Sequence, residues 1–219
     1  GDVDDMKYTE TGFRPLYHNF CYFPMVETIK KMIDTMAYYK LNSLQLYVEH
    51  VFEFEESKAL WDLTGYLTGE ELREIGKYCK DNFIEFIPSL STFGHMCVLL
   101  NQPQYRHLRV LNDYKDSVNS WWDRMLHHTI GPLQEESFEF VKSLINQYAP
   151  HFESDVFNIC CDETFDLSKY EKEGRDVGAL YLDFTKKIIS HVQSLGKRVM
   201  MWGDVLLEHP EIITEFPED

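Results

Sequence analysis

The strongest constraint on the fold is a regular alternation between short apolar runs and longer amphipathic stretches. The apolar runs have the length of buried strands, and they lie at residues 16–23, 44–48, 83–87, 156–161 and 198–202. The intervening stretches repeat their apolar side chains at a helical period, at residues 25–37, 69–79, 138–148 and 180–195. This order predicts parallel strands joined by crossover helices.

Local signals mark several ends of the predicted elements. Thr68 and Glu71 have the spacing of a capping box, which predicts a helix that begins at residue 69. Gly196 suits the position just after a helix end. Pro88 is expected to stop the strand at residues 83–87.

Two architectures fit this alternation, and one of them fits better. A doubly wound sheet that binds a nucleotide would carry a glycine-rich fingerprint after its first strand, and the sequence has none. A (β/α)8 TIM barrel has eight strands, of which about five are visible here. We therefore expect a TIM-barrel type fold in one domain, residues 1–219, with about the first five β/α units and an end before strand six. An incomplete barrel exposes a strand edge, so self-association is expected.

Composition narrows the class of partner and the compartment. Lys and Arg number 21 against 37 Asp and Glu, a net charge of −16, which disfavours nucleic acid. No apolar stretch approaches the length of a membrane span, and the polar N-terminus lacks a signal-peptide pattern. The five cysteines form no CxxC pair, so reduced, buried thiols in a cytoplasmic protein are expected.

The residues that follow the predicted strands carry the candidate chemistry, because active sites of parallel α/β folds lie at the carboxyl ends of strands. Asp162 and Glu163 follow the run at 156–161. Like charge and burial raise the pKa of one member of such a pair, which suits a general acid. An ordinary acidic loop explains the two residues equally well on spacing alone.

Three other strand ends offer polar or aromatic groups, each with a simpler alternative. His95 follows the third strand and could bond a substrate or a carboxylate, although a single His is more often structural. Glu49 follows the second strand and could instead be part of a solvated face. Trp202 and Asp204 follow the fifth, where the Trp could wall a sugar pocket or belong to the core.

The long connection at residues 89–133 is unusual for a compact domain and favours a functional role. It contains His127 and His128, which lack the spacing of a metal site and are expected to lie on the surface or to serve loop packing. The sequence has no HExxH, GxSxG or Walker motif, so neither a metal nor a nucleotide cofactor is expected.

Four segments together resemble glycoside hydrolase family 20, the β-N-acetylhexosaminidases, and most of all its hexosaminidase D-like and bacterial branches. The resembling segments run from about residue 12 to the end, and they are Leu46-Tyr47-Val48-Glu49-His50, Thr92-Phe93-Gly94-His95-Met96, Phe157-Asn158-Ile159-Cys160-Cys161-Asp162-Glu163-Thr164 and Met201-Trp202-Gly203-Asp204.

The resemblance implies removal of terminal β-linked N-acetylglucosamine or N-acetylgalactosamine by substrate-assisted catalysis, in which the substrate's acetamido oxygen is the nucleophile. Glu163 would be the general acid and then the base, and Asp162 would orient the acetamido group and stabilise the oxazolinium. Trp202 would wall the acetamido pocket. His95 and Glu49 would support the carboxylates or contact the substrate, and Asp204 is a further candidate for substrate binding.

The sequence also departs from the family pattern. Thr11 stands where members usually carry an Arg that grips sugar hydroxyls, and His18-Asn19 lies near the place of an expected Asp. These departures keep a non-catalytic carbohydrate-binding barrel open as an alternative. A retaining glycosidase with its own nucleophile is a third reading, and it would need a distant partner such as Glu49 or Asp204.

Overall fold

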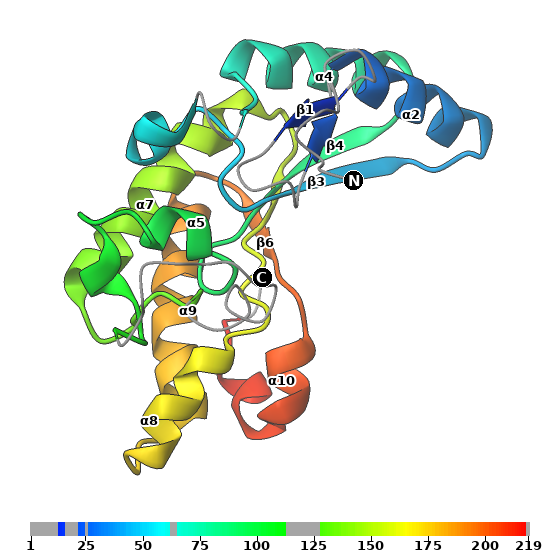
Figure 1. The fold of residues 1–219 in the computed structure, drawn as a ribbon. Coiled ribbons are helices and arrows are strands. Elements are labelled where there is room, and N and C mark those ends of the chain that lie inside the picture. Colours follow the sequence, from blue (N-terminus) through cyan, green and yellow to red (C-terminus); the bar gives the residue numbers. More distant parts are fainter. Residues whose placement is uncertain (1–12, 16–21, 25, 62–64, 113–127, 218–219) are drawn as a thin grey trace, which may run out of the picture. The chain divides into compact units, whose positions relative to one another are not determined.

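The computed structural model describes residues 13–15, 22–24, 26–61, 65–112 and 128–217. Figure 1 shows their helices and strands along the chain. The predicted positions of Trp121, Trp122 and His127 in the long connection, and those of Thr11, His18 and Asn19, lie outside these residues.

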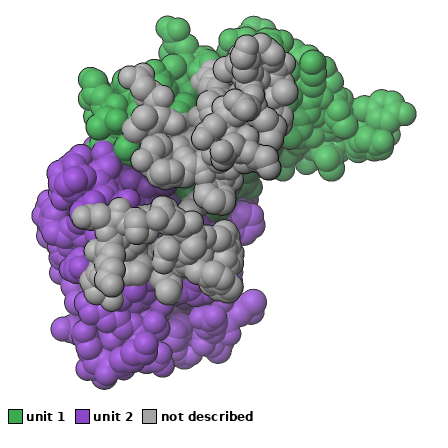
Figure 2. All heavy atoms as spheres, in the orientation of Figure 1, with its two compact units in different colours: residues 1–88, 147–154 green, residues 89–146, 155–219 purple. Residues whose placement is uncertain are grey.

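The chain divides into two compact units, which Figure 2 colours separately. The first comprises residues 1–88 and 147–154, and the second comprises residues 89–146 and 155–219. Strand β4 (Glu85–Leu90) begins in the first unit and ends in the second. The parallel sheet has the strand order β3-β4-β5-β6.

The first unit contains a two-stranded antiparallel pair, a strand of the parallel sheet and two long helices. In the pair, β1 (Phe13–Pro15) lies beside β2 (Tyr22–Pro24). The described end of the apolar run at 16–23 therefore pairs with an antiparallel neighbour, and not within the parallel sheet as the alternation suggested. The other elements are α2 (Val26–Tyr38), β3 (Ser43–Val48), the 3-10 turn η3 (Glu55–Leu60), α4 (Gly69–Asp81) and the 3-10 turn η5 (Ala149–His151).

The apolar face of α4 is buried, as its helical period predicts, whereas that of α2 is buried only in part, since Met32 on this face is 40% exposed. Ile29 and Ile33 of α2 and Leu72 and Ile75 of α4 are all fully buried. The capping box at the start of α4 is also confirmed: the Thr68 side chain accepts a hydrogen bond from the backbone N–H of Glu71, and the Glu71 carboxylate accepts one from the backbone N–H of Thr68. This reciprocal pair satisfies two amides that a helix leaves unbonded at its start.

The third predicted strand is shifted by a few residues. Pro88 was expected to stop it, but Pro88 lies inside β4, which continues to Leu90. The strand begins at Glu85 because Phe83, expected to be its first residue, has a φ of 59° and an exposed side chain. Phe83 thus belongs to the turn that follows α4.

The second unit contains the carboxyl ends of three neighbouring parallel strands. Strand β5 (Val156–Asn158) pairs with β4 through Ser89 and Asn158, and β6 (Arg198–Met200) pairs with β5 in register from Val156 opposite Arg198. The helical segments are α5 (Cys97–Leu100), η4 (Arg106–Leu108), α7 (Glu135–Tyr148), η6 (Phe165–Leu167), α8 (Ser168–Lys172), α9 (Val177–Ser194), α10 (Asp204–Glu208) and η7 (Pro210–Glu215). The last two residues of α7 are assigned to the first unit.

Helix α9 forms the core of the second unit together with the segment after β4. It packs on β6, and it buries Tyr181, Phe184 and Ile188. Phe93 is fully buried against α9, with its ring 5.4 Å from that of Tyr181 and 4.7 Å from that of Phe184. This packing fixes the position of residues 91–95, which lead to His95.

No helix within the described ranges has both the length and the apolar character that crossing a membrane requires.

Candidate active site

The candidate residues of the second unit follow three adjacent parallel strands. His95 comes after β4, Asp162 and Glu163 come after β5, and Trp202 and Asp204 come after β6. Parallel strands end at the same edge of a sheet, so these residues lie at one edge. This is the edge where parallel α/β folds place their chemistry.

His95 meets both carboxylates of the predicted pair. Its Nε2 lies 3.0 Å from Oε2 of Glu163 and 3.6 Å from Oδ2 of Asp162. The exposed fractions of the side chains are 17% for His95, 17% for Asp162 and 40% for Glu163. Glu163 is therefore the carboxyl more accessible to a bound molecule, whereas Asp162 is the more enclosed one.

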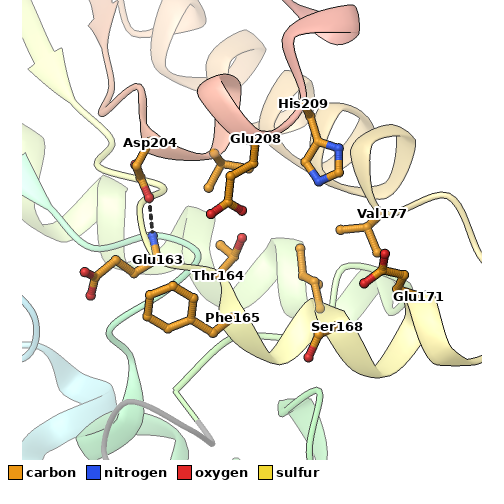
Figure 3. Close-up of a pocket in the computed structure, with 11 residues that line it drawn as sticks. Glu163, Thr164, Phe165, Ser168, Glu171, Val177, Asp204, Glu208 and His209 are labelled. Atoms are coloured by element: carbon orange, nitrogen blue, oxygen red, sulfur yellow. Dashed lines mark hydrogen bonds between the residues drawn. The ribbon is translucent and has the colours of Figure 1, made fainter.

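Asp204 holds the backbone of Glu163. Its Oδ2 accepts a hydrogen bond of 2.9 Å from the backbone N–H of Glu163, which Figure 3 shows as a dashed line. Trp202, also after β6, donates its backbone N–H to the carbonyl of Cys160, and its side chain is 44% exposed. The indole is thus available to a ligand, and the substrate-binding roles of Trp202 and Asp204 stay predictions.

Glu49, the remaining predicted site residue, belongs to the first unit. It comes directly after β3, its side chain is 22% exposed, and its Oε2 lies 4.0 Å from Nδ1 of His50. Its role in substrate binding stays a prediction.

The backbone of the site adopts conformations that are rare for residues other than glycine. The φ angles of His95, Cys160, Cys161 and Glu163 are 58°, 59°, 61° and 50°. Each such residue carries strain of about 1–3 kcal/mol, which persists only where the surrounding structure holds it. At Cys160 and Cys161 the positive φ angles take the backbone out of the extended conformation of a strand. This is why β5 ends at Asn158, three residues before the predicted end of its apolar run.

Side chains help to hold the strained segment after β5, in addition to two backbone hydrogen bonds with the β6 segment, from Ile159 N–H to the Met200 carbonyl and from Trp202 N–H to the Cys160 carbonyl. Thr92 donates its hydroxyl to the carbonyl of Ile159 at 2.6 Å, and Tyr181 donates its hydroxyl to the carbonyl of Cys161 at 2.9 Å. The Asn158 side chain accepts a hydrogen bond from the backbone N–H of Cys160. These bonds satisfy buried backbone groups and fix the path that leads to Asp162.

Gly94 is required by the close approach of two backbone segments. A Cβ at this position would lie 2.2 Å from the carbonyl oxygen of Asp162 and 3.3 Å from that of Glu163. The segment before His95 therefore lies directly against the backbone of the carboxylate pair. This contact gives a physical reason for the Gly-His sequence after β4.

His128 is part of the site, although its sequence suggested only a surface position or loop packing. Its Nδ1 accepts a hydrogen bond of 3.2 Å from the backbone N–H of His95, and its Nε2 lies 2.7 Å from the carbonyl oxygen of Glu163. The side chain is buried, and so is that of Asp166, which accepts the backbone N–H groups of His128 and Thr129. The unusual length of the connection at residues 89–133 was the one feature of the sequence that pointed to a place for His128 in the site.

The two cysteines beside the carboxylates, Cys160 and Cys161, are buried and free, as is Cys79. Burial raises the pKa of the Cys161 thiol to about 12, and burial also raises that of the Cys160 thiol. Burial likewise raises the pKa of Tyr181, so its hydroxyl keeps the proton that it donates to Cys161. These groups are structural supports and not nucleophiles at neutral pH.

A cavity of about 330 Å³ is bordered by Glu163 and by residues of the segments that follow it and β6 (Figure 3). Its lining includes Glu163, Phe165 and Asp204, together with Glu208 and His209 from the end of α10. The volume is within the range of small-molecule sites. Within the described ranges, no cluster of three or more His, Cys, Asp or Glu side chains could hold a metal ion.

Two curated relatives of the chain are hexosaminidases. The chain is 28% identical to a β-hexosaminidase of Porphyromonas gingivalis, an alignment that covers 89% of this chain and 28% of that protein. It is 25% identical to human hexosaminidase D, with coverage of 86% and 38%. The chain thus spans well under half the length of these two relatives.

Solved structures of the same class share the fold. A chitobiase of Flavobacterium johnsoniae superposes with a TM-score of 0.69 at 22% identity, over 89% of this chain and 32% of that one. A β-N-acetylhexosaminidase of Bacteroides fragilis superposes with a TM-score of 0.66 at 22% identity, over 83% and 39%. These likenesses, with the parallel sheet and its helices, confirm the predicted (β/α)8 TIM-barrel type fold.

A family model settles the classification that the strand-end segments suggested. The model of the glycosyl hydrolase family 20 catalytic domain matches residues 21–216, a range that contains Glu49, His95, the carboxylate pair, Trp202 and Asp204. The chain therefore belongs to glycosyl hydrolase family 20.

Proposed function

We propose that the protein removes terminal β-linked N-acetylglucosamine or N-acetylgalactosamine from glycans by substrate-assisted, retaining catalysis. The observation that carries the proposal is the convergence of Asp162 and Glu163 on one nitrogen of His95, at 3.6 and 3.0 Å. Membership of the family and the hexosaminidase names of the relatives support it.

The geometry favours the substrate's acetamido oxygen over a protein carboxylate as nucleophile. An enzyme nucleophile and its acid partner must flank the scissile bond from opposite sides of the sugar. Two adjacent carboxylates that converge on the same imidazole nitrogen are poorly placed to do so. They are well placed to act together on one side of the substrate's reacting centre.

The roles of the two carboxyls follow from their surroundings. Glu163, the more exposed of the two, protonates the leaving oxygen and then takes a proton from the incoming water. Asp162, more enclosed, accepts a hydrogen bond from the acetamido N–H and stabilises the positive charge of the oxazolinium. His95 orients both carboxylates, Trp202 walls the acetamido pocket, and Asp204 keeps the Glu163 backbone in place.

The leaving-group dependence of two variants tests these roles in the protein at its natural full length. Glu163→Gln should lower kcat/KM by about 10²–10⁴-fold on phenyl β-N-acetylglucosaminide, which needs a proton donor. It should lower kcat/KM far less on the dinitrophenyl glycoside, whose leaving group needs none, because kcat/KM does not include the later attack of water. Asp162→Asn should lower kcat on both substrates, because with either one the acetamido oxygen bonds to the anomeric carbon as the leaving group departs, and Asp162 stabilises the oxazolinium that results.

Two exposed acidic residues of the same unit provide matched controls. Asp183→Asn on α9 and Glu173→Gln after α8 make the same chemical changes away from the site and should leave kcat unchanged. If Glu163→Gln and Asp162→Asn behaved like these controls, the proposed roles would be wrong. A folded wild-type protein that binds N-acetylglucosamine without hydrolysing either glycoside would support the non-catalytic alternative.

Location and association are further proposals. The buried, free thiols support a cytoplasmic location. In the described residues β6 pairs with β5 alone and has mostly exposed side chains, so we propose that the 219-residue chain by itself associates through this edge. Sedimentation of the isolated chain as a stable monomer at micromolar concentration would contradict that association.

A further inference from the structure

The His128 ring connects two backbone segments that carry catalytic side chains. One ring nitrogen, Nδ1, receives the backbone N–H of His95 at 3.2 Å, and the other, Nε2, lies 2.7 Å from the carbonyl oxygen of Glu163. The His128 side chain is 1% exposed. The two ring nitrogens therefore join the segment after β4 to the segment after β5.

These two bonds define which nitrogen carries the proton. A backbone N–H can only donate, so Nδ1 of His128 must present its lone pair to His95. A carbonyl oxygen can only accept, so Nε2 must carry the proton and donate it to Glu163. His128 is therefore neutral, with one acceptor and one donor, and no other side chain of this size and shape offers both at these positions.

Backbone hydrogen bonds and a ring contact hold His128 in place. The backbone N–H groups of His128 and Thr129 both donate to Oδ2 of buried Asp166 at 2.9 Å. The His128 carbonyl accepts the backbone N–H of Met96, and the ring stacks on Phe165 with a centroid distance of 6.0 Å. A ring held so firmly can impose a distance on the segments that it joins.

Both residues that His128 holds are strained. The φ angles of His95 and Glu163 are 58° and 50°, and strained residues relax when their restraints are removed. The side chains of these residues meet, since His95 Nε2 lies 3.0 Å from Glu163 Oε2. The separation of the two backbones therefore sets the contact between the imidazole and the carboxyl.

We propose that His128 is a positioning residue for the reaction, which holds the backbones of His95 and Glu163 at the separation where the His95 imidazole meets the Glu163 carboxyl. His128 acts through these two residues and does not contact the substrate. This inference rests on the proposed function, since it assigns His128 to the proton transfer by Glu163.

Three substitutions of His128 separate its two bonds. His128→Asn keeps an acceptor near the place of Nδ1 and loses the donor to Glu163. His128→Gln keeps a donor near the place of Nε2 and loses the acceptor for His95. His128→Ala loses both.

The first readout is amide hydrogen exchange at His95 in the full-length protein, measured by mass spectrometry with residue-level fragmentation. Exchange at His95 should be at least about tenfold faster in His128→Ala and His128→Gln, because the bonded acceptor is lost. It should stay close to wild type in His128→Asn. Equal His95 exchange rates in the wild type and all three variants would show that His128 does not hold the His95 backbone. That result would overturn the proposal whether or not the protein hydrolyses glycosides.

The second readout is the leaving-group dependence of kcat/KM, which reports the step in which the leaving group departs. His128→Ala should lower kcat/KM on the phenyl glycoside by about 10²-fold, since misplacing a catalytic group by about 1 Å has an effect of this size. The loss of kcat/KM on the dinitrophenyl glycoside should be much smaller. Equal losses on both substrates would mean that His128 only supports the fold, and the positioning role would be wrong.

A control removes general instability as an explanation. Ile188→Ala deletes a buried side chain of α9 in the same unit and removes no partner of the two His128 hydrogen bonds, so it should lower the melting temperature without altering the leaving-group dependence. If the wild type hydrolysed neither glycoside, the proposed function would be wrong. The exchange rate at His95 would still show whether His128 holds the His95 backbone. If the wild type were active and His128→Ala matched Ile188→Ala in kcat/KM, the positioning role alone would fall.

Discussion

Gly94→Ala should damage the active site through a single methyl group. The added Cβ would lie 2.2 Å from the backbone carbonyl oxygen of Asp162, whereas ordinary van der Waals contact begins near 3.4 Å. The two segments must therefore separate by about 1 Å, since no side-chain rotation can relieve a clash between backbone groups. We expect a loss of stability of about 1–3 kcal/mol and a loss of kcat of about 10²-fold.

The assay for Gly94→Ala combines kcat on aryl β-N-acetylglucosaminide with urea unfolding. Gly203→Ala is the matched control, because a Cβ at Gly203 meets no atom within 4 Å although the residue lies between Trp202 and Asp204. This control should keep both kcat and stability. Wild-type kcat in Gly94→Ala would refute the idea that its backbone contact positions the carboxylate pair.

Three other predictions concern stability. Asp166→Ala should destabilise the protein by about 1–3 kcal/mol for each of the two buried backbone N–H groups that it leaves unbonded, and urea unfolding equal to wild type would contradict this. Thr68→Ala should lower stability by about 1 kcal/mol through loss of the capping box without changing kcat, and a change in kcat would show that the helix start matters to the site. Burial raises the pKa of Cys161 to about 12, above the ~8.5 of an exposed thiol, so the unfolded state loses this proton first and stability should fall as pH rises from about 9 towards 12. Cys161→Ala should make that fall shallower, and an unchanged slope would count against the raised pKa.

Much of the fold could be predicted because its signals are local and repeated. The helical period of apolar residues located α2, α4, α7 and α9, and the Thr68 capping box fixed the start of α4. The existence of β3, β4, β5 and β6 was also predictable from the apolar runs, whereas β1 lies outside all of them. Strand ends were not, because they depend on partners elsewhere: Pro88 is accommodated within β4, and β5 ends at Asn158.

The candidate site was predictable where residues directly follow strands. His95 and the carboxylate pair were identified from that position, and the structure brings them within ion-pair distance of each other. The roles of His128 and Asp166 were not predictable, because they depend on hydrogen bonds between segments 35 to 38 residues apart in the chain. The contact that demands Gly94 is equally non-local, since it joins the segments after β4 and β5.

The central claim is that the substrate's own acetamido group is the nucleophile at the Asp162–Glu163 pair. The most direct test is to compare hydrolysis of aryl β-N-acetylglucosaminide, β-N-acetylgalactosaminide and β-glucoside by the protein at its natural full length. We predict turnover of one or both acetamido sugars and none of the glucoside, which lacks the nucleophile. Turnover of the glucoside at a comparable rate would contradict the claim, because it would require a nucleophile supplied by the protein.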